Sequence, residues 1–149
     1  MRAVAQRVSS AQVTVDGKVT GRIDRGLMAL IGVGVDDSQA DADAMAEKLA
    51  NLRIFNDEAG LMNKSVGDVR GGVLLVSQFT LHGDVRRGRR PSFITAARED
   101  LAKPLYERVG AILERNGIPV AYGVFGAHMD VRLVNDGPVT ILLDTKKVF

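Results

Sequence analysis

Alternating apolar and polar positions near the N-terminus predict a β-hairpin. The alternation runs through residues 2–15 but changes phase at Ser9 and Ser10, so a β-bulge there would keep one face of the strand buried. Asp16-Gly17 is a dipeptide that type I′ turns favour, because both central residues of that turn need a positive φ. Residues 18–23 are therefore expected to return as the second strand.

A nearly continuous apolar run at residues 27–33 predicts a central strand that is buried on both faces. Gly32-Val33-Gly34 at its end looks like part of a nucleotide-binding loop. However, no third glycine follows at the required spacing, and Asp36 and Asp37 would repel phosphate. We interpret the segment as a turn into a helix that Asp37 or Ser38 caps. The helix would bury one apolar face, formed by Ala42, Met45, Ala46, Leu49 and Leu52.

Residues 73–81 begin as a run of branched apolar residues, which is typical of a strand buried on both faces. From Ser77 the segment becomes polar, with Gln78 and Thr80 following, although no glycine or asparagine ends the strand. The end of a buried strand holds such groups rigidly, as a reaction site requires. The pattern therefore predicts a functional site built on this strand end.

The C-terminal half is predicted to add a second helix and three strands. The helix is expected within residues 96–116, and its regular part should begin near Lys103 because Pro104 is tolerated only in a first helical turn. Its buried face would be formed by Leu101, Leu105, Val109 and Ile112. The strands are expected at residues 120–124, 129–134 and 139–143, with Gly137-Pro138 separating the last two. Residues 1–149 are thus expected to form one α/β domain.

Composition narrows the classes of function. The 149 residues include no cysteine and no tryptophan, which excludes a disulfide scaffold, a cysteine-based zinc site and a thiol nucleophile. No segment approaches the ~20 apolar residues of a membrane span, and residues 1–7 lack the apolar core of a signal peptide. We therefore expect a cytoplasmic protein with no membrane partner.

The formal net charge is only +2, but the basic residues are concentrated in one segment. Arg86-Arg87-Gly88-Arg89-Arg90 places four guanidinium groups within five residues, just beyond the polar strand end. This segment could contact the phosphates of a polyanion, or it could be a solvated loop. Phe79 and Phe125 likewise could stack on a nucleic-acid base or belong to the core.

A catalytic side-chain pair has few candidates in this sequence. The only histidines are His82 and His128, and either Ser77 or Thr80 with His82 as its base is a conceivable nucleophile pair. The Gly-x-Ser-x-Gly motif that exposes a nucleophilic serine is missing. We therefore favour another chemistry over a serine or threonine nucleophile.

Two other kinds of site need no catalytic side-chain pair: a metal site and an oxyanion hole made of backbone N–H groups. His128 and Asp130 would share one face of a strand and could bind a metal, but no third ligand is apparent, so we expect no metal site. Backbone N–H groups near Gly126, Gly137 and the polar strand end could form an oxyanion hole. Such a hole stabilises a developing negative charge without any catalytic side chain.

Two motifs occur in a characteristic order and spacing, Ser77-Gln78-Phe79-Thr80-Leu81 and Asn135-Asp136-Gly137-Pro138-Val139-Thr140. Together they resemble the signatures of the bacterial and eukaryotic D-aminoacyl-tRNA deacylase family, first named D-tyrosyl-tRNA deacylase. The resemblance extends over the whole chain. It includes the segments Met1-Arg2-Ala3-Val4, Gly88-Arg89-Arg90-Pro91-Ser92-Phe93 and Phe125-Gly126-Ala127 with Met129.

The resemblance implies curved, mixed β-sheets, partly barrel-like, with two helices in each subunit of a homodimer. It also implies hydrolysis of the ester that links a D-amino acid to the 3′-terminal adenosine of tRNA, with no cofactor and no DNA partner. In this family the Gly-Pro peptide is cis and reaches from one subunit into the pocket of the other. Gly137 and Pro138 are therefore expected to form a rigid wall that rejects an L side chain. Glycine has no side chain to clash, so Gly-tRNA should also be cleaved.

The resemblance further implies roles for individual residues. The backbone N–H groups of Phe79 and Thr80 would stabilise the tetrahedral oxyanion, the Thr80 side chain would position the substrate, and the 2′-OH of the terminal ribose would help to activate water. Ser77 and Gln78 would contact the substrate. The adenosine pocket would be lined by Phe125, Gly126, Ala127 and Met129. The acceptor-stem phosphates would be bound by Arg86, Arg87, Arg89 and Arg90.

Two competing functions belong to other classes. The first is a small-molecule esterase that uses Ser77 or Thr80 with His82, which turnover of simple esters would reveal. The second is a non-catalytic RNA-binding module built on the basic segment and the phenylalanines, which would bind tRNA without deacylating it.

Overall fold

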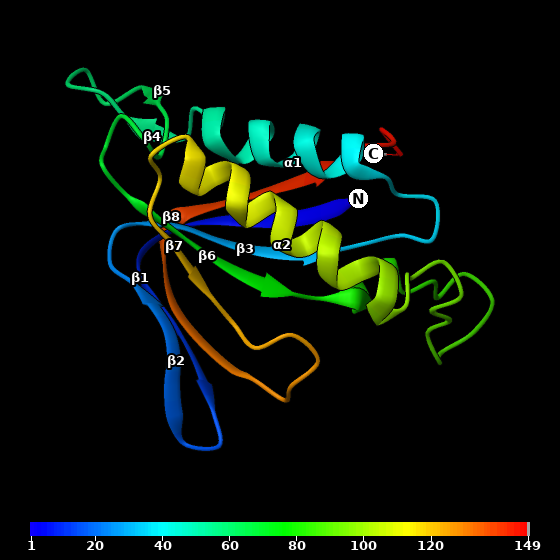
Figure 1. The fold of residues 1–149 in the computed structure, drawn as a ribbon. Helices are drawn as coiled ribbons and strands as arrows, with labels where there is room; N and C mark the ends of the chain where they lie inside the picture. Colours follow the sequence, from blue (N-terminus) through cyan, green and yellow to red (C-terminus); the bar gives the residue numbers. More distant parts are fainter. Residues whose placement is uncertain (149) are drawn as a thin grey trace.

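The computed structural model describes residues 1–148, in which two helices lie on one face of a strongly curved sheet (Figure 1). The helices are α1 (Gln39–Asn51) and α2 (Glu99–Arg115). The main sheet contains β1 (Arg2–Val15), β2 (Lys18–Ile23), β3 (Gly26–Gly32), β6 (Gly72–Ser77), β7 (Val120–Tyr122) and β8 (Asp130–Asp144). A second, two-stranded sheet is formed by β4 (Phe55–Asn56) and β5 (Met62–Lys64). The fold therefore has the mixed sheets and two helices that we expected.

The long strand β1 organises the main sheet, because it pairs along its length with three other strands. Its first half lies between β3 and β8, and its second half lies between β2 and β8, all in antiparallel orientation. β6 then pairs parallel with β3, and β7 pairs parallel with β6. The sheet curves until β2 approaches β7 so closely that a Cβ atom on Gly21 would lie 2.3 Å from the carbonyl oxygen of Tyr122. The main sheet is thus nearly a barrel.

The N-terminal hairpin confirms the prediction made from its turn residues. Asp16 and Gly17 have φ angles of 48° and 76°, the two positive values that a type I′ turn requires. The pairing of β1 with β8 is irregular between Val8 and Ser10, so the predicted bulge is also present.

The C-terminal strands differ from the prediction. The two strands expected on either side of Gly137-Pro138 are one continuous strand, β8, which runs from Asp130 to Asp144. Gln6 pairs with Thr140 and Val8 pairs with Asn135, so residues 136–139 lie opposite Arg7 alone and bulge out of the ladder. A proline that cannot donate a ladder hydrogen bond is tolerated at such a bulge, which explains why the dipeptide does not end the strand.

Helix α1 begins and packs as its sequence indicates. Ser38 is the N-cap residue, and the Asp41 carboxylate accepts hydrogen bonds from both the backbone N–H and the hydroxyl of Ser38 at 2.9 Å. Met45 and Leu49 are fully buried against the sheet. The predicted apolar face is therefore confirmed, except that Leu52 lies at the C-cap.

Helix α2 begins earlier than we predicted, because Pro104 lies inside it instead of in its first turn. Glu99 is the first helical residue, so Pro104 interrupts the helical hydrogen-bond ladder at the carbonyl of Asp100. Both residues are exposed, so water can bind that carbonyl. The buried face is also shifted: Leu101 is 37% exposed, whereas Leu105, Tyr106, Val109 and Leu113 are buried.

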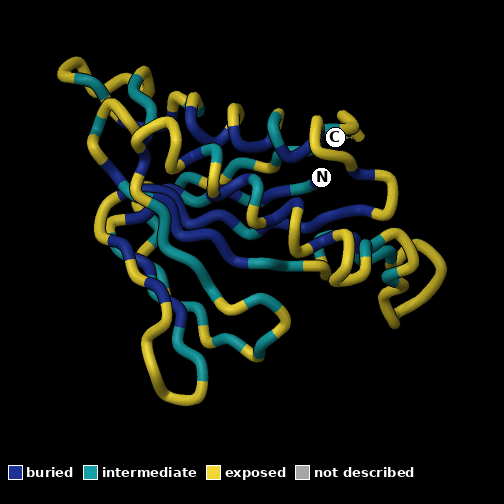
Figure 2. The backbone as a smooth tube through the Cα atoms, in the orientation of Figure 1, coloured by how far each residue is buried: buried dark blue, intermediate teal, exposed yellow. Residues whose placement is uncertain are grey.

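The core lies on both sides of the curved sheet. The central strands of the sheet are buried over much of their length, as the dark blue segments show (Figure 2). On the helical side, Leu27, Ile31 and Leu75 pack against α1 and α2. Val13, Met28 and Leu74 fill the inside of the curved part, under the hairpin. Among residues 1–148, no helix has the length and apolar character needed to cross a membrane.

Candidate functional site

A pocket of about 430 Å³ lies at the carboxyl end of β6. Its walls come from the ends of β3 and β6, the first turns of α2, and the segment between β7 and β8. The lining residues include seven of the eight residues to which the resemblance gave a role in catalysis or in binding the ester and adenosine, namely Ser77, Gln78, Phe79, Phe125, Gly126, Ala127 and Met129, and they do not include Thr80. The remaining lining residues are Ile31, Val33, Val76, Ala97, Glu99, Ala102, Tyr106, His128 and Val131.

The chain turns sharply where the polar strand end was predicted. β6 stops at Ser77, and residues Phe79–His82 form one short 3₁₀ helix. Within residues 1–148, the backbone N–H groups of Phe79 and Thr80 have no hydrogen-bond acceptor, whereas Gln78 N–H donates to the carbonyl of Ile31 at 2.7 Å. Unpaired N–H groups are inherent to the first turn of a helix, so this turn offers two donors to a ligand.

The side chains near these two donors are held in place. The Gln78 side-chain amide donates a hydrogen bond to the Thr80 hydroxyl. The Phe79 ring is 56% exposed and meets the Phe93 ring edge to face, with centroids 5.1 Å apart. Phe79 is therefore not a core residue, and its ring is available to stack on a ligand.

The facing wall is aromatic and is fixed from the core. The Tyr106 hydroxyl donates a 2.8 Å hydrogen bond to the carbonyl of Leu75, and burial raises the pKa of Tyr106 above its ordinary value. The Phe125 ring packs on Tyr106 with centroids 5.8 Å apart. Phe125 thus lies between the core and the pocket, with Gly126 and Ala127 beside it.

The two histidines do not form the side-chain sites that we considered. His82 is only 7% exposed, its ring is hydrogen-bonded to the Gly32 backbone, and its Nε2 atom has no partner within residues 1–148. It is therefore not hydrogen-bonded to Ser77 or Thr80, and the proposed nucleophile pair is not formed. His128 is exposed at the pocket rim. In the described part of the chain, no cluster of three metal-binding side chains occurs.

Gly137 and Pro138 are joined by a cis peptide bond, as the motif resemblance implied. They do not line the pocket of their own chain. Arg7, which contacts this bulge, pairs with Leu27 of β3, whereas the Ser77 end of β6 pairs with Ile31. Four residues of strand span about 13 Å, so the two features lie toward opposite ends of the sheet.

The Gly137-Pro138 bulge is anchored on both sides. Arg7 donates from Nε to the carbonyl of Asp136 at 3.1 Å and from Nη1 to the carbonyl of Ile54 at 2.6 Å. The Asn135 side chain accepts a hydrogen bond from the N–H of Val139 at 2.9 Å. Arg7 is only 8% exposed, so these contacts form a rigid base beneath an exposed tip. Arg7 belongs to a segment, Gln6-Arg7-Val8, that fits the family pattern, but the sequence assigned no role to it.

The four arginines lie in a closed loop next to the pocket. Residues 84–92, which we call the basic loop, are closed by two backbone hydrogen bonds of 2.8 and 2.9 Å between Asp84 and Ser92. Arg86 binds Asp84 with two hydrogen bonds, which hold the pKa of that carboxyl well below its usual range. Among the described residues, the other loop arginines form no ion pair and are exposed; they are Arg87, Arg89 and Arg90. Three guanidinium groups are therefore free to contact an anion.

The structure also identifies pocket residues that the sequence analysis missed. Ala97, Glu99, Ala102 and Tyr106 reach the pocket from the start of α2. Because we expected the helix to begin near Lys103, we did not expect its first turn at the site. Of these four residues, only Tyr106 could have been recognised from the sequence as a site residue, because it is a polar aromatic residue on the buried face of the helix.

A family model and two relatives in sequence carry deacylase names. The family model described as D-Tyr-tRNA(Tyr) deacylase matches residues 4–144. A protein of Koribacter versatilis named D-aminoacyl-tRNA deacylase is 60% identical over 149 residues, which cover 100% of both chains. A protein of the same name from Thermotoga petrophila is 58% identical over 149 residues, again with complete coverage of both chains.

Solved structures share the fold. One named c-Myc DNA Unwinding Element Binding Protein superposes with a TM-score of 0.88 at 41% identity, covering 97% of this chain and 99% of the other. A second, described as a probable eukaryotic D-amino acid tRNA deacylase, has a TM-score of 0.79 at 21% identity and covers 95% and 97% of the two chains. The second likeness supports the fold alone.

Proposed function

The chain belongs to the D-Tyr-tRNA(Tyr) deacylase family, and from this membership we propose that it hydrolyses the ester between a D-amino acid and the 3′-terminal adenosine of tRNA. The products would be a free D-amino acid and a tRNA that can be charged again, which makes the reaction a chiral proofreading step in translation. The observation that carries this proposal is the pair of N–H groups, unpaired among residues 1–148, on Phe79, which lines the pocket, and on Thr80, the next residue of the same turn.

These two donors supply the chemistry that ester hydrolysis needs most. Attack of water on the ester carbonyl produces a tetrahedral oxyanion, and preorganised N–H groups stabilise it without any covalent intermediate. Each such donor contributes about 10²–10³ in rate in other hydrolases. Ser77 and Gln78 would hold the ester against the turn, and Thr80 would act as a positioning residue through its hydrogen bond from Gln78.

The pocket offers few side chains that could activate the attacking water. The pocket lining contains one carboxylate, Glu99, and one histidine, His128, both of which are exposed. A group on the substrate can serve instead, and the 2′-OH of the terminal ribose is adjacent to the ester. We therefore assign the activation of water to this hydroxyl. A tRNA ending in 2′-deoxyadenosine should then be hydrolysed far more slowly, although it would still bind.

Chirality would be selected by a wall that a second copy of the chain provides. Within one chain, Gly137 and Pro138 lie away from the pocket, and their anchored bulge is exposed at its tip. If the bulge of a partner entered the pocket, its backbone carbonyls would occupy the position of an L side chain. A D side chain would point away from them, and glycine would meet no obstacle. The active unit would then be a homodimer with two shared sites.

A partly uncovered region of the sheet supports this dimer. On the face of the main sheet opposite α1 and α2, the adjacent strands β3, β1 and β8 carry Leu30, Val4 and Leu142. Leu30 packs against the second core cluster and Val4 is partly buried, whereas Leu142 is 60% exposed. Apolar residues on three adjacent strands form a surface that association would remove from water. Among residues 1–148, β8 pairs with no strand other than β1, so its second edge is open to a partner.

The terminal adenosine and the acceptor stem of the tRNA would contact the aromatic wall of the pocket and the basic loop. The terminal adenosine would fit between Phe79 and the wall formed by Phe125, Gly126, Ala127 and Met129, where its base could stack. The acceptor-stem phosphates would lie on the basic loop, which is joined to this pocket through the Phe79–Phe93 contact. Arg87, Arg89 and Arg90 would contribute most, because Arg86 is already paired with Asp84.

The decisive experiment compares D-aminoacyl-tRNA, L-aminoacyl-tRNA and Gly-tRNA. The three are made on the same tRNA wherever that tRNA can be charged with the amino acid. We expect release of the amino acid from D-aminoacyl-tRNA and from Gly-tRNA, and no release from the matched L-aminoacyl-tRNA. Cleavage of the L form at the rate of the D form would contradict a chiral wall. An intact Gly-tRNA alongside a cleaved D-aminoacyl-tRNA would contradict selection by sterics.

A nucleic-acid-binding role without catalysis is the alternative that the basic loop favours. One relative with 41% identity is named for binding a DNA element, and arginines contact the phosphates of DNA and RNA alike. Binding of duplex DNA in preference to tRNA, with no release of D-amino acids, would support that alternative. We expect tRNA to be preferred, because the pocket beside the loop fits a single unpaired nucleotide.

A further inference from the structure

His82 ends the short turn that carries Phe79 and Thr80, yet nothing in the proposed chemistry uses it. It is the most deeply buried side chain of that turn, with an exposure of 7%. Its ring is hydrogen-bonded to the Gly32 backbone, at the end of the neighbouring strand β3. A side chain held in this way fixes the far end of the turn relative to the main sheet.

Two glycines make room for the imidazole ring. A Cβ atom on Gly34 would lie 3.0 Å from Cε1 of His82, which is its nearest neighbour. A Cβ atom on Gly32 would lie 2.9 Å from the carbonyl oxygen of Gln78, 3.0 Å from Cβ of Leu81 and 3.2 Å from Cδ2 of His82. All these distances are tighter than ordinary van der Waals contact, so larger residues would displace the ring and the turn that carries it. Gly32-Val33-Gly34, which looked like part of a phosphate-binding loop, is thus the surface on which His82 packs, while Val33 between them lines the pocket.

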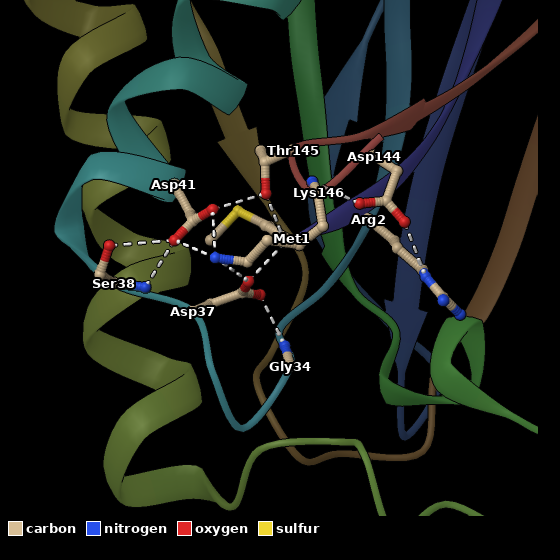
Figure 3. A network of polar contacts seen from close by, with 9 residues as sticks. All are labelled: Met1, Arg2, Gly34, Asp37, Ser38, Asp41, Asp144, Thr145 and Lys146. Carbon is tan, nitrogen blue, oxygen red and sulfur yellow. Dashed lines mark hydrogen bonds and ion pairs between the residues drawn. The ribbon is translucent and has the colours of Figure 1, made fainter. Parts of the chain in front are cut away.

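The charged groups around the ring make its protonation unfavourable. The Arg2 guanidinium and the Met1 ammonium both disfavour a second positive charge there, and only Asp37 favours it. Asp37 is already occupied, because it accepts hydrogen bonds from the Met1 ammonium at 2.6 Å and from the N–H of Gly34 at 2.7 Å (Figure 3). The cavity behind the ring is also lined by Asp36, Asp144 and Lys146.

Burial, which is the largest effect, and the two cations lower the pKa of His82 below its ordinary value of 6.5, and together they outweigh the hydrogen bond to the Gly32 backbone and the Asp37 carboxylate, which raise it. The ring is therefore neutral at physiological pH. Because the folded-state pKa is lowered, the stabilisation by neutral His82 is complete above pH about 6.5 and is lost as the pH falls through the folded-state pKa. The unpartnered Nε2 atom is where the added proton would be buried without an acceptor.

We propose that His82 is a positioning residue for deacylation: in its neutral form it holds the Phe79–His82 turn against the end of β3, and its protonation releases the turn and weakens the oxyanion site. This inference rests on the proposed function, since it assigns the donors of Phe79 and Thr80 to the reaction. The predicted consequence is that the rate of deacylation falls at acid pH because His82 becomes protonated, although His82 does not contact the substrate.

The test compares wild type with His82→Asn and His82→Ala, using single-turnover deacylation of D-aminoacyl-tRNA between about pH 5 and pH 8. Asparagine retains a donor near the position of Nδ1 but does not titrate in this range. Alanine retains neither the donor nor the packing. Leu49→Ala, which removes a fully buried side chain of α1 outside the pocket, controls for a general loss of stability.

We expect His82→Asn to match wild type near pH 7.5 and to keep its rate at low pH, so that the ratio of wild-type to variant rates falls several-fold toward pH 5. His82→Ala should lower kcat about tenfold at all pH values with little change in KM, whereas Leu49→Ala should leave kcat unchanged at temperatures where it is folded. Superposable pH profiles of wild type and His82→Asn would overturn the inference. If wild type released no D-amino acid near pH 7.5, the proposed function would fail instead.

Discussion

The two ends of the main sheet present opposite properties. At the carboxyl end of β6, the chain offers an open pocket and N–H donors that are unpaired among residues 1–148. At the other end, the Gly137-Pro138 bulge offers a rigid backbone surface anchored by Arg7 and Asn135, and neither residue of the bulge lines that pocket. In the proposed function, reaction and selection are thus separated within one chain, and a second chain would bring them together.

This separation has a physical advantage. A backbone donor and a backbone wall have fixed positions, because neither has rotatable side-chain bonds, so both are insensitive to the identity of the amino acid. One site could therefore accept D-amino acids of many kinds. Substitutions at the pocket and at the Gly137-Pro138 bulge can therefore test the two ends of the main sheet separately.

The largest effect should follow from removing one oxyanion donor. Phe79→Pro deletes a single N–H at the first position of the turn, where proline is tolerated. Phe79→Ala keeps the N–H and removes the same aromatic ring, so it is the matched control. We expect kcat of Phe79→Pro to be about 10²–10³ lower than that of Phe79→Ala in single-turnover deacylation. Equal rates for the two variants would show that this N–H is not used.

The next effect concerns the wall. Arg7→Met keeps most of the side-chain volume but leaves the carbonyls of Asp136 and Ile54 without their donor. We expect the ratio of D to L rates to fall by at least about tenfold and the free energy of unfolding to fall by about 2 kcal/mol. Urea denaturation and parallel assays of both substrates measure the two changes. Arg53→Met, which removes hydrogen bonds to Asn63 at an exposed site, should leave the ratio intact.

Much of the local structure could be predicted from residues that are close together in the sequence, and the position of the site could be predicted from two motifs. Asp16-Gly17 and Ser38 predicted their turn and cap because these features depend on neighbouring residues alone. The strand end at Ser77 was predicted for the same reason, although the turn that follows it was not. Here Phe79 leaves the strand and exposes its ring, which the apolar pattern does not reveal.

The errors have one physical cause, since each depends on a distant partner. β8 continues through Gly137-Pro138 because β1 supports it on both sides of the bulge. α2 continues through Pro104 because its buried face packs on the sheet, and this outweighs one lost hydrogen bond. Arg7 and Tyr106 acquire their importance only from carbonyls far away in the sequence, those of Asp136 and Leu75.

A moderate effect is expected at Thr80. Thr80→Ala removes the hydroxyl that accepts a hydrogen bond from Gln78 but keeps the backbone N–H. We expect about a tenfold lower kcat, because the residue positions the turn and the substrate without forming a bond to it. Thr80→Ser should recover most of this loss. Complete inactivity of a folded Thr80→Ala protein would instead favour covalent catalysis by the hydroxyl.

The smallest effect should come from the basic loop. Replacing Arg87, Arg89 and Arg90 together by glutamine should weaken tRNA binding more at low salt than at high salt and reduce the magnitude of the slope of log K against log salt by about 2. Binding titrations at several salt concentrations measure this slope. The ratio of D to L rates should not change, because neither end of the sheet is altered. A matched replacement of the exposed Arg22, Arg115 and Arg132 should leave the slope closer to that of wild type.

The central claim is that each active site combines the pocket of one chain with the Gly137-Pro138 bulge of another. It can be tested by mixing two defective proteins, Phe79→Pro and Gly137→Ala. The added methyl group of Gly137→Ala would lie 2.8 Å from Val139 Cγ2 at a φ of 131°, which distorts the bulge. After exchange of subunits, half of the dimers join the intact pocket of a Gly137→Ala chain to the intact bulge of a Phe79→Pro chain, so about a quarter of all sites have both parts intact. We expect the ratio of D to L rates in the mixture to rise above that of Gly137→Ala alone. A mixture whose ratio stays at the value of Gly137→Ala alone would contradict a shared site.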